Sequence, residues 1–251
     1  MNDDPRTPYP PDSQPESVMV SLPSAPPYLT YVLIGITVFF YILQIIAPFI
    51  FGFDLVTALL AKDNELIRNG QLWRLLTPAL VHGSITHIGF NMYALFSLGS
   101  NLENFYGRGR FLLLYVLGAF AGNVLSFLFT SSPAVGASTA IFGLIGAEGI
   151  FLYQNRGVLG ERARRALGNV IFIALFNLFV IGSLSFIDNW GHIGGLVGGL
   201  MFSSFAGPLW VLQRDPLGYE LADQRTARDV AVGATVTLLI FSALAMWGLT
   251  R

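Results

Sequence analysis

The chain holds three histidines, His82, His87 and His192, and each lies at or within the end of a long segment without charge. An ionisable side chain inside a bilayer is costly, so such residues usually face the interior of a helix bundle and mark function. For any one of them a packing hydrogen bond between helices, worth about 0.6 kcal/mol on average, is the plainer interpretation. Three histidines at one predicted depth, together with a serine, favour chemistry instead.

That serine, Ser138, stands among small residues in the apolar stretch VGASTAIFGLIGAEG, residues 135–149. A serine hydroxyl becomes a nucleophile when a neutral histidine within hydrogen-bond reach takes its proton. His192 shares a helix face with Gly195 and Gly199, and such a stripe of small residues lets a second helix approach closely. If the second helix is the one that Ser138 begins, the two side chains lie at the same depth. The pattern therefore predicts a Ser138–His192 pair.

The motif HIGFN places His87 and Asn91 four residues apart, and hence on one face of a helix. Both side chains can donate hydrogen bonds toward a common point. With the backbone N–H of Ser138 at a helix N-terminus, they suit the stabilisation of an oxyanion. A third residue that orients His192 is not evident, because Asp188 belongs to a loop beside a span, where acidic side chains are usually solvated.

Long uncharged segments must position these residues. Of the 251 residues 53% are hydrophobic and only 12% are charged, whereas soluble domains carry about 25% charged residues. A spanning helix needs about 20 mostly apolar residues, and Pro133 divides the longest uncharged segment in two. The sequence therefore predicts an all-α polytopic membrane protein. Its seven predicted spans are 28–51, 84–102, 109–130, 136–154, 167–186, 190–211 and 228–249.

The charges outside the spans predict the orientation. Cytoplasmic loops of membrane proteins carry an excess of Lys and Arg. With the N-terminus in the cytoplasm, ten of the 14 Lys and Arg residues fall inside, and the predicted site lies at the outer end of the bundle. The four that fall outside are Lys62, Arg68, Arg74 and Arg251.

The ends of the chain and its composition further limit the classes of protein to which the chain can belong. Residues 1–27 hold eight of the 13 prolines, which is typical of a disordered tail, and they lack the basic start of a signal peptide. Residues 212–227 read as a cytoplasmic loop before the seventh span and the C-terminus, 228–251. Cysteine is absent, which excludes thiol chemistry, and a net charge of −1 argues against a nucleic-acid partner. We predict no cofactor and no metal, and the oligomeric state stays open.

Five motifs resemble the rhomboid family of intramembrane serine proteases. They are WRLLTPALVH at 73–82, the HxxxN pair at 87 and 91, NLENFYG at 101–107, GAST at 136–139 and GHIGGLVGG at 191–199. They follow the family's order across residues 72–200. The resemblance implies a six-helix core at 28–211, with a cavity that opens to the outer side, followed by one C-terminal transmembrane helix. It implies Ser138 as nucleophile, His192 as base, and His87 with Asn91 as the oxyanion hole. Four further matches carry structural roles: Trp73, Arg74, His82 and Glu103.

One departure keeps an alternative open, because Thr139 stands where the family's GxSG motif has glycine. The leading hypothesis is an endopeptidase of a bacterial plasma membrane that cuts transmembrane protein substrates near the outer face of the bilayer. The alternative is a catalytically silent rhomboid-like protein that binds transmembrane clients. A transporter with a histidine proton relay is a third reading, but it requires acidic residues beside the histidines in the outer half of the bundle.

Overall fold

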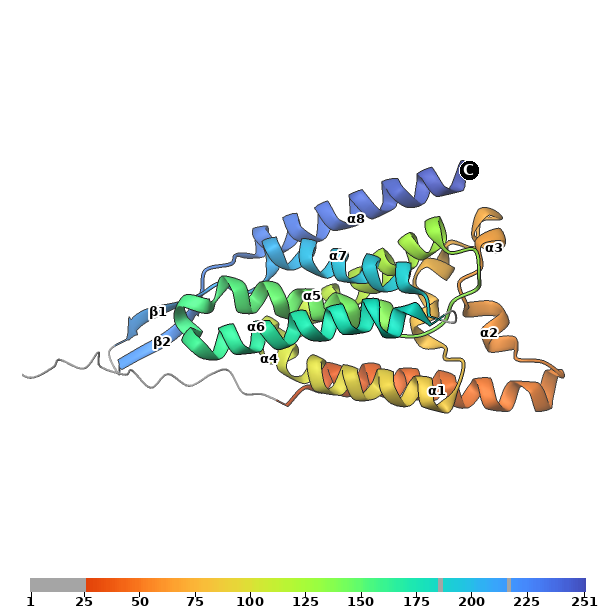
Figure 1. The fold of residues 1–251 in the computed structure, drawn as a ribbon, viewed down its shortest axis with the longest axis horizontal. Helices are drawn as coiled ribbons and strands as arrows, with labels where there is room; N and C mark the ends of the chain where they lie inside the picture. Colours follow the sequence, from red (N-terminus) through yellow and green to blue (C-terminus); the bar gives the residue numbers. More distant parts are fainter. Residues whose placement is uncertain (1–25, 185–186, 216–217) are drawn as a thin grey trace, which may run out of the picture.

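The computed structural model describes residues 26–184, 187–215 and 218–251, and most of them are helical. The greater part of the predicted tail, residues 1–25, lies outside the described residues. The long helices run side by side along one axis of the molecule (Figure 1). They are α1 (Tyr28–Phe51), α4 (Ile85–Phe129), α5 (Ser138–Gln154), α6 (Arg156–Phe179), α7 (Asn189–Ala206) and α8 (Ala227–Leu249).

Short elements lie at the ends of this bundle. At the end where α5 and α7 begin, the loop after α1 contains α2 (Leu55–Leu60), α3 (Asn64–Arg68) and the 3-10 turns η1 (Leu72–Leu75) and η2 (Thr77–Leu80). A further 3-10 turn, η3 (Ile181–Ser183), follows α6. We call this the outer end of the bundle, and the opposite one, which carries the hairpin β1 (Trp210–Asp215) and β2 (Gly218–Asp223), the inner end.

Helix α4 contains two of the predicted spans, 84–102 and 109–130. Gly107 interrupts it with a φ of +72° and a ψ of 159°, a conformation that residues with a Cβ rarely adopt. The chain reverses direction at this point, so the two halves of α4 run along the bundle in opposite directions (Figure 1). The break lies at the inner end, within the stretch that separates the two predicted spans.

Helices α4, α5 and α7 form the centre of the bundle and meet through glycine backbones. A Cβ added at Gly195 would overlap the carbonyl oxygen of Thr139, and one at Gly199 would overlap that of Gly143. Small residues permit this close approach of helices. The glycine stripe predicted on α7 therefore faces α5, as the spacing of His192 and the glycines indicated.

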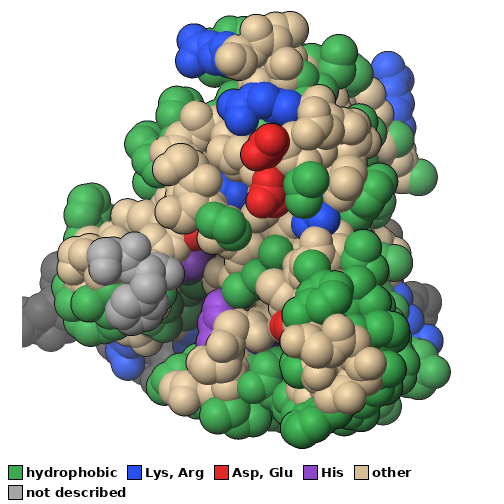
Figure 2. Space-filling view, turned by 90° about the vertical axis from the view of Figure 1, so that its right-hand side faces the viewer, with side chains coloured by type: hydrophobic (Ala, Val, Ile, Leu, Met, Phe, Trp, Pro, Cys, Tyr) green, Lys and Arg blue, Asp and Glu red, His purple; other side chains and the backbone are tan. Residues whose placement is uncertain are grey.

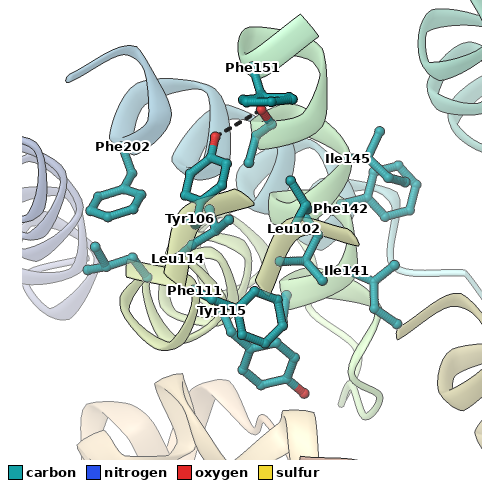
Figure 3. Close-up of a cluster of buried hydrophobic side chains, with 14 of the residues drawn as sticks. Leu102, Tyr106, Phe111, Leu114, Tyr115, Ile141, Phe142, Ile145, Phe151 and Phe202 are labelled. Atoms are coloured by element: carbon teal, nitrogen blue, oxygen red, sulfur yellow. Dashed lines mark hydrogen bonds between the residues drawn. The ribbon is translucent and has the colours of Figure 1, made fainter. Parts of the chain in front are cut away.

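Aromatic and aliphatic side chains fill the core of the bundle (Figure 3). Tyr106 is 4% exposed and donates a hydrogen bond from its Oη to the carbonyl of Ala147 at 3.1 Å. Phe151 stacks on Phe105 with ring centroids 4.7 Å apart, and Trp210 of β1 meets both rings edge-on. The hairpin is thus attached to the helical core by a buried tryptophan.

The structure of the inner end differs from two predicted boundaries, the end of the span 190–211 and the extent of the loop 212–227. Helix α7 ends at Ala206 rather than at 211, and the predicted loop 212–227 contains most of an antiparallel hairpin and the first residue of α8. The physical reason is Asn155, whose side-chain oxygen accepts from Trp210 N at 2.7 Å while its amide donates to Pro208 O at 2.9 Å. These bonds hold the chain after α7 in an extended conformation.

Glu103 of α4 holds the start of α1. Its buried carboxylate accepts hydrogen bonds from the backbone N–H groups of Leu29 and Thr30 at 2.8 and 2.7 Å, and from the Thr30 hydroxyl at 2.8 Å. A negative charge at a helix N-terminus also interacts favourably with the helix dipole. These contacts fit the structural role expected for Glu103.

Within the described residues, four helices are long and apolar enough to cross a membrane by length and composition: Tyr28–Phe51, Ile85–Phe129, Arg156–Ser183 and Ala227–Leu249. Ile85–Phe129, at 45 residues, contains two predicted spans. Helix α5 has only 17 residues, and α7 contains several glycines and polar residues. For these reasons neither helix is among the four. Both are packed against other helices in the centre of the bundle, where apolar side chains are not required on every face. The count of seven spans stays a prediction.

Candidate active site

Ser138 and His192 meet where α5 and α7 begin. The Oγ of Ser138, the first residue of α5, lies 3.0 Å from Nε2 of His192 in the first turn of α7. The His192 ring stacks on Phe142 with centroids 4.2 Å apart and planes 11° from parallel. Histidine side chains are visible in a recess of the surface when the molecule is seen from this end (Figure 2). The two residues that the sequence pattern paired are therefore within hydrogen-bond distance.

Gly136 shapes the segment that leads into Ser138. Its φ is +124°, which favours glycine, and its N–H donates to the carbonyl of Pro78 at 2.9 Å. A Cβ at this position would lie 2.7 Å from two ring atoms of His87 and 3.7 Å from Ser138 Oγ. The absence of a side chain at Gly136 therefore makes room for the His87 imidazole beside the serine.

Asn91 lies one turn below His87 on α4 and is 6% exposed. Its amide Nδ2 donates to the carbonyl of His87, at 3.0 Å, within its own helix. The structure thus brings His87 next to Ser138 and binds the Asn91 amide to the helix backbone. Catalytic hydrogen bonds often tighten only when substrate is bound, so the bond of Asn91 to its own helix does not exclude the residue as a donor to substrate.

His82 supports the serine segment from the loop. Its Nε2 accepts the backbone N–H of Ala137 at 3.3 Å, so the ring proton sits on Nδ1. The ring is 2% exposed, and burial, followed by the proximity of His87, lowers the pKa of His82 to about 3. His82 is therefore a neutral acceptor that fixes the residue before Ser138, in keeping with a structural role.

Two residues that the sequence reasoning missed connect this loop to the helices. Gln44 of α1 exchanges hydrogen bonds with the backbone of His82 at 3.0 and 3.1 Å. Lys62 pairs with the backbone of Ala134 at 2.9 and 3.2 Å, and its side chain is fully buried. The sequence shows Lys62 only as one charge in a polar loop, and Gln44 only as a polar residue in an apolar span.

Arg74 holds the loop together. Its guanidinium donates to the carbonyls of Ala61 and Ala58 at 2.6 Å each and to the Gln71 side chain at 2.8 Å. Trp73 is 49% exposed and donates its ring N–H to the carbonyl of Leu59 at 3.1 Å. Both residues contact loop backbone, which agrees with structural rather than chemical roles. Across the part of the chain that is described, no group of three or more His, Cys, Asp or Glu side chains is arranged to hold a metal ion.

Comparison with known proteins identifies the family. The family model of the Rhomboid domain matches residues 69–208, which is more than half of the chain. The chain belongs to the rhomboid family. Its membership and its long apolar helices make it a multi-pass integral membrane protein.

Similar rhomboids include proteins named as proteases. Rhomboid protease GluP of Bacillus subtilis is 40% identical over 182 residues, which cover 72% of this chain and 35% of that protein. Rhomboid-like protease 1 of Toxoplasma gondii is 38% identical over 143 residues, 55% of this chain and 48% of that protein. RHOMBOID-like protein 9, chloroplastic, of Arabidopsis thaliana is 34% identical over 149 residues, 59% of this chain and 34% of that protein. The chain thus spans between a third and a half of the length of these relatives.

Proposed function

We propose that this rhomboid is an intramembrane serine endopeptidase that cleaves transmembrane-helix substrates near the outer membrane face. The observation that carries the proposal is the 3.0 Å contact between Ser138 Oγ and His192 Nε2. A nucleophile and a base at hydrogen-bond distance are the minimal machinery of acyl transfer. Relatives that are named proteases add support.

The proposed reaction has two stages. Ser138 Oγ attacks the carbonyl carbon of the scissile peptide, its proton passes to Nε2 of His192, and the carbonyl π electrons move to the oxygen. The tetrahedral intermediate collapses, the C–N bond breaks, and His192 returns the proton to the leaving amine. In the second stage a water molecule gives its proton to His192 and its hydroxyl to the acyl carbon, and Ser138 leaves with the proton.

The oxyanion of each tetrahedral intermediate needs donors aimed at it. We assign this role to His87, whose ring lies beside Gly136 and Ser138, and to the Asn91 amide one turn away. The backbone N–H of Ser138, in the first turn of α5, has no partner within that helix and adds a third donor. Release of Asn91 from the carbonyl of His87 when substrate binds completes the set.

The position of the site at one end of the bundle supports cleavage near one membrane face. Lys62, Arg68 and Arg74 lie in the loop at the outer end, where Arg251 ends the chain after α8. The described arginines at the inner end are Arg108, Arg110, Arg156, Arg162, Arg164, Arg165, Arg214, Arg225 and Arg228. The excess of arginines at the inner end supports a cytoplasmic N-terminus and a site that faces the other compartment. A bacterial plasma membrane is the location that we propose. Substrate helices with Gly, Pro or small residues expose their peptide bonds most readily.

The alternative function, a silent binder of transmembrane clients, rests on Thr139. The side chain of Thr139 packs against Gly122 and Gly191, because a Cβ added at Gly122 would lie 2.5 Å from Thr139 Cβ and one at Gly191 3.2 Å from its Cγ2. The contact between Ser138 and His192 coexists with it. This placement favours the protease over the silent binder.

The test uses the full chain in liposomes, a transmembrane substrate with a glycine- and proline-containing helix, and a serine-reactive fluorophosphonate probe. We expect the wild type to be labelled and to cleave, and Ser138→Ala to do neither. Ser132→Ala, which changes an exposed serine of the same outer segment, is the matched control and keeps both activities. Binding of substrate by a wild type that neither labels nor cleaves would support the silent binder instead.

A further inference from the structure

Asp188 stands at the N-terminus of the helix that carries His192. Its Oδ1 caps α7 by accepting the N–H of Gly191 at 3.1 Å, and it also accepts the hydroxyl of Thr130 at 3.0 Å. Its carbonyl accepts the backbone N–H of His192 at 3.1 Å. The second carboxylate oxygen, Oδ2, is buried and has no hydrogen-bond partner among the described residues. Asp188 is therefore a half-buried residue with one buried carboxylate oxygen that its capping role does not use.

His192 has a complementary unused atom. For Ser138 to give its proton to Nε2, the neutral ring must carry its own proton on Nδ1. That Nδ1 is buried and, within the described ranges, has no hydrogen-bond partner. Proton transfer from serine then creates a buried imidazolium, which is costly unless an anion lies near it. Helix α7 itself contains no Asp or Glu, and Asp188, its N-cap residue, lies one helical turn before His192.

A buried cation lies on the other side of Asp188. The Nζ of Lys62 donates to the carbonyl of Thr130 at 2.8 Å, while the hydroxyl of Thr130 donates to Asp188. Burial lowers the pKa of Lys62 to about 8, and the carboxylates of Asp188 and Asp63 partly offset this effect. Thr130, the residue that follows α4, thus joins the cation of the outer loop to the acidic residue that caps α7.

We propose that Asp188 is a positioning residue that acts through His192 by fixing the start of α7 and by stabilising the imidazolium formed during the reaction. The hydroxyl of Thr130 holds the carboxylate in place, and Lys62 in turn binds the carbonyl of Thr130. The inference rests on the proposed protease function and extends it beyond the pair of reacting residues. No additional proton transfer is involved: Asp188 neither gives nor takes a proton while the Ser138 proton moves to Nε2 and then to the leaving amine.

The Asp188→Asn variant separates the two parts of this role. Asparagine caps a helix as well as aspartate does, so the variant keeps the cap and loses only the charge. We expect kcat to fall by roughly 10- to 100-fold with KM unchanged, less than the 10⁴-fold cost of the orienting Asp→Asn change in a Ser-His-Asp triad. Asp188→Ala loses the cap as well and is slower still. A role in capping alone predicts wild-type kcat in Asp188→Asn, and that result would overturn the proposal.

A second variant removes the ambiguity of folding. Asp188→Asn alone removes one of the two carboxylates near the buried Lys62 and leaves Asp63 as the other, and a buried charge that loses a partner destabilises a fold. The double change Lys62→Gln and Asp188→Asn removes both charges and keeps a donor to the carbonyl of Thr130. We expect its thermal stability to return toward that of the wild type while kcat stays low. Recovery of kcat together with stability would show that the charge serves the fold only.

Asp63→Asn is the matched control, because Asp63 also caps a helix, α3, and also lies near Lys62. It is expected to cleave at the wild-type rate, and a loss as large as that of Asp188→Asn would contradict the proposal.

The experiments distinguish a failure of the role proposed for Asp188 from a failure of the proposed protease function. If Ser138→Ala abolishes cleavage but Asp188→Asn cleaves like the wild type, only the role of Asp188 falls. If the wild type itself neither labels nor cleaves, both fall.

Discussion

Both ends of the bundle bury polar side chains, and they differ in how those side chains are bonded. At the inner end Asn155, 1% exposed, uses its whole amide: Oδ1 accepts from Trp210 N, and Nδ2 donates to the carbonyls of Phe151 and Pro208 at 2.8 and 2.9 Å. This residue joins α5, the end of α7 and the hairpin. Its hydrogen bonds stabilise structure and leave nothing over for a ligand.

At the outer end the bonding is incomplete. In the described part of the chain, every buried histidine or carboxylate atom that lacks a hydrogen-bond partner lies there: Nδ1 of His82, Nδ1 of His192 and Oδ2 of Asp188. Folded proteins satisfy roughly 90% or more of their buried polar groups, so such exceptions need an explanation. The inner end also holds buried polar atoms that lack a partner among the described residues, including Oε1 of Gln154, Oγ of Ser203 and Nε of Arg225. The two ends therefore differ in kind: the unpartnered atoms of histidine and carboxylate side chains, which can take part in proton transfer, lie at the outer end beside Ser138.

The strongest test of this comparison removes the pair itself. Ser138→Ala and His192→Ala are each expected to abolish cleavage while leaving the protein folded and inserted, because each removes half of the machinery that moves the proton. Residues that act as a unit are strongly non-additive, so the double variant is expected to be no slower than either single one. Cleavage rates and thermal unfolding of the three variants check this. Near-wild-type turnover in His192→Ala would refute the pair.

The oxyanion donors come next in size. Loss of one such donor costs about 10²- to 10³-fold in rate, or roughly 3–4 kcal/mol. His87→Ala and Asn91→Ala are expected to lower kcat by this amount without loss of substrate binding. Asn123→Ala is the control, because Asn123 is also a buried asparagine of α4 that donates to the carbonyl four residues earlier, at 2.9 Å. Equal losses in Asn91→Ala and Asn123→Ala would assign Asn91 to packing.

Much of the site was predictable because its signals are local. The spacing of His87 and Asn91, and the stripe formed by His192 with Gly195 and Gly199, depend only on helix periodicity, which a membrane span enforces. The contact of that stripe with α5 followed from the size of glycine. Family resemblance gave the same residues, and their catalytic roles stay predictions.

The parts that could not be predicted depend on contacts between distant segments. Lys62 binds the carbonyl of Thr130 just after α4, and Gln44 binds the backbone of His82. Neither contact follows from the spacing of residues along the sequence. The hairpin was read as a loop because the apolar pattern of residues 190–211 continues past Ala206, where Asn155 of a different helix binds the backbone. The hydropathy pattern of a segment does not show which side chain from a distant part of the chain will bind its backbone.

His82 allows the outer end to be tested by pH. It precedes α4, outside the predicted spans, and its pKa is about 3 in the folded protein, against about 6.5 in an unfolded chain. The unfolded state therefore binds more protons between these values, so stability falls by a few kcal/mol as the pH drops through this window. His82→Gln keeps an acceptor for Ala137 N and does not titrate. Its unfolding temperature is expected to vary less between pH 7 and pH 4, and parallel curves would contradict the assignment.

The inner end is tested by Asn155→Ala. The change leaves the N–H of Trp210 and the carbonyl of Pro208 buried without partners, at a cost of about 1–3 kcal/mol for each unsatisfied group. Thermal stability is expected to fall, while kcat of the folded fraction stays at the wild-type value because the residue lies at the far end from Ser138. Asn177→Ala, which changes a half-buried asparagine of α6 that also donates to the carbonyl four residues earlier, is expected to change neither. A selective loss of kcat in Asn155→Ala would break the division between the two ends.

Substitutions of Thr139 are expected to have the smallest effect on the cleavage rate, and they distinguish the protease from the silent binder most directly. Thr139 is 5% exposed, its Oγ1 has no partner among the described residues, and its side chain fills the space between Gly122 and Gly191. Thr139→Val keeps that shape and removes an unsatisfied hydroxyl, so it is expected to be equally or slightly more stable, with unchanged labelling by a fluorophosphonate. Thr139→Gly opens a void beside α7, and we expect a rate change of less than about tenfold, equivalent to about 1.4 kcal/mol. An unlabelled wild type beside a strongly labelled Thr139→Gly would reverse this argument, because threonine would then be what silences the serine.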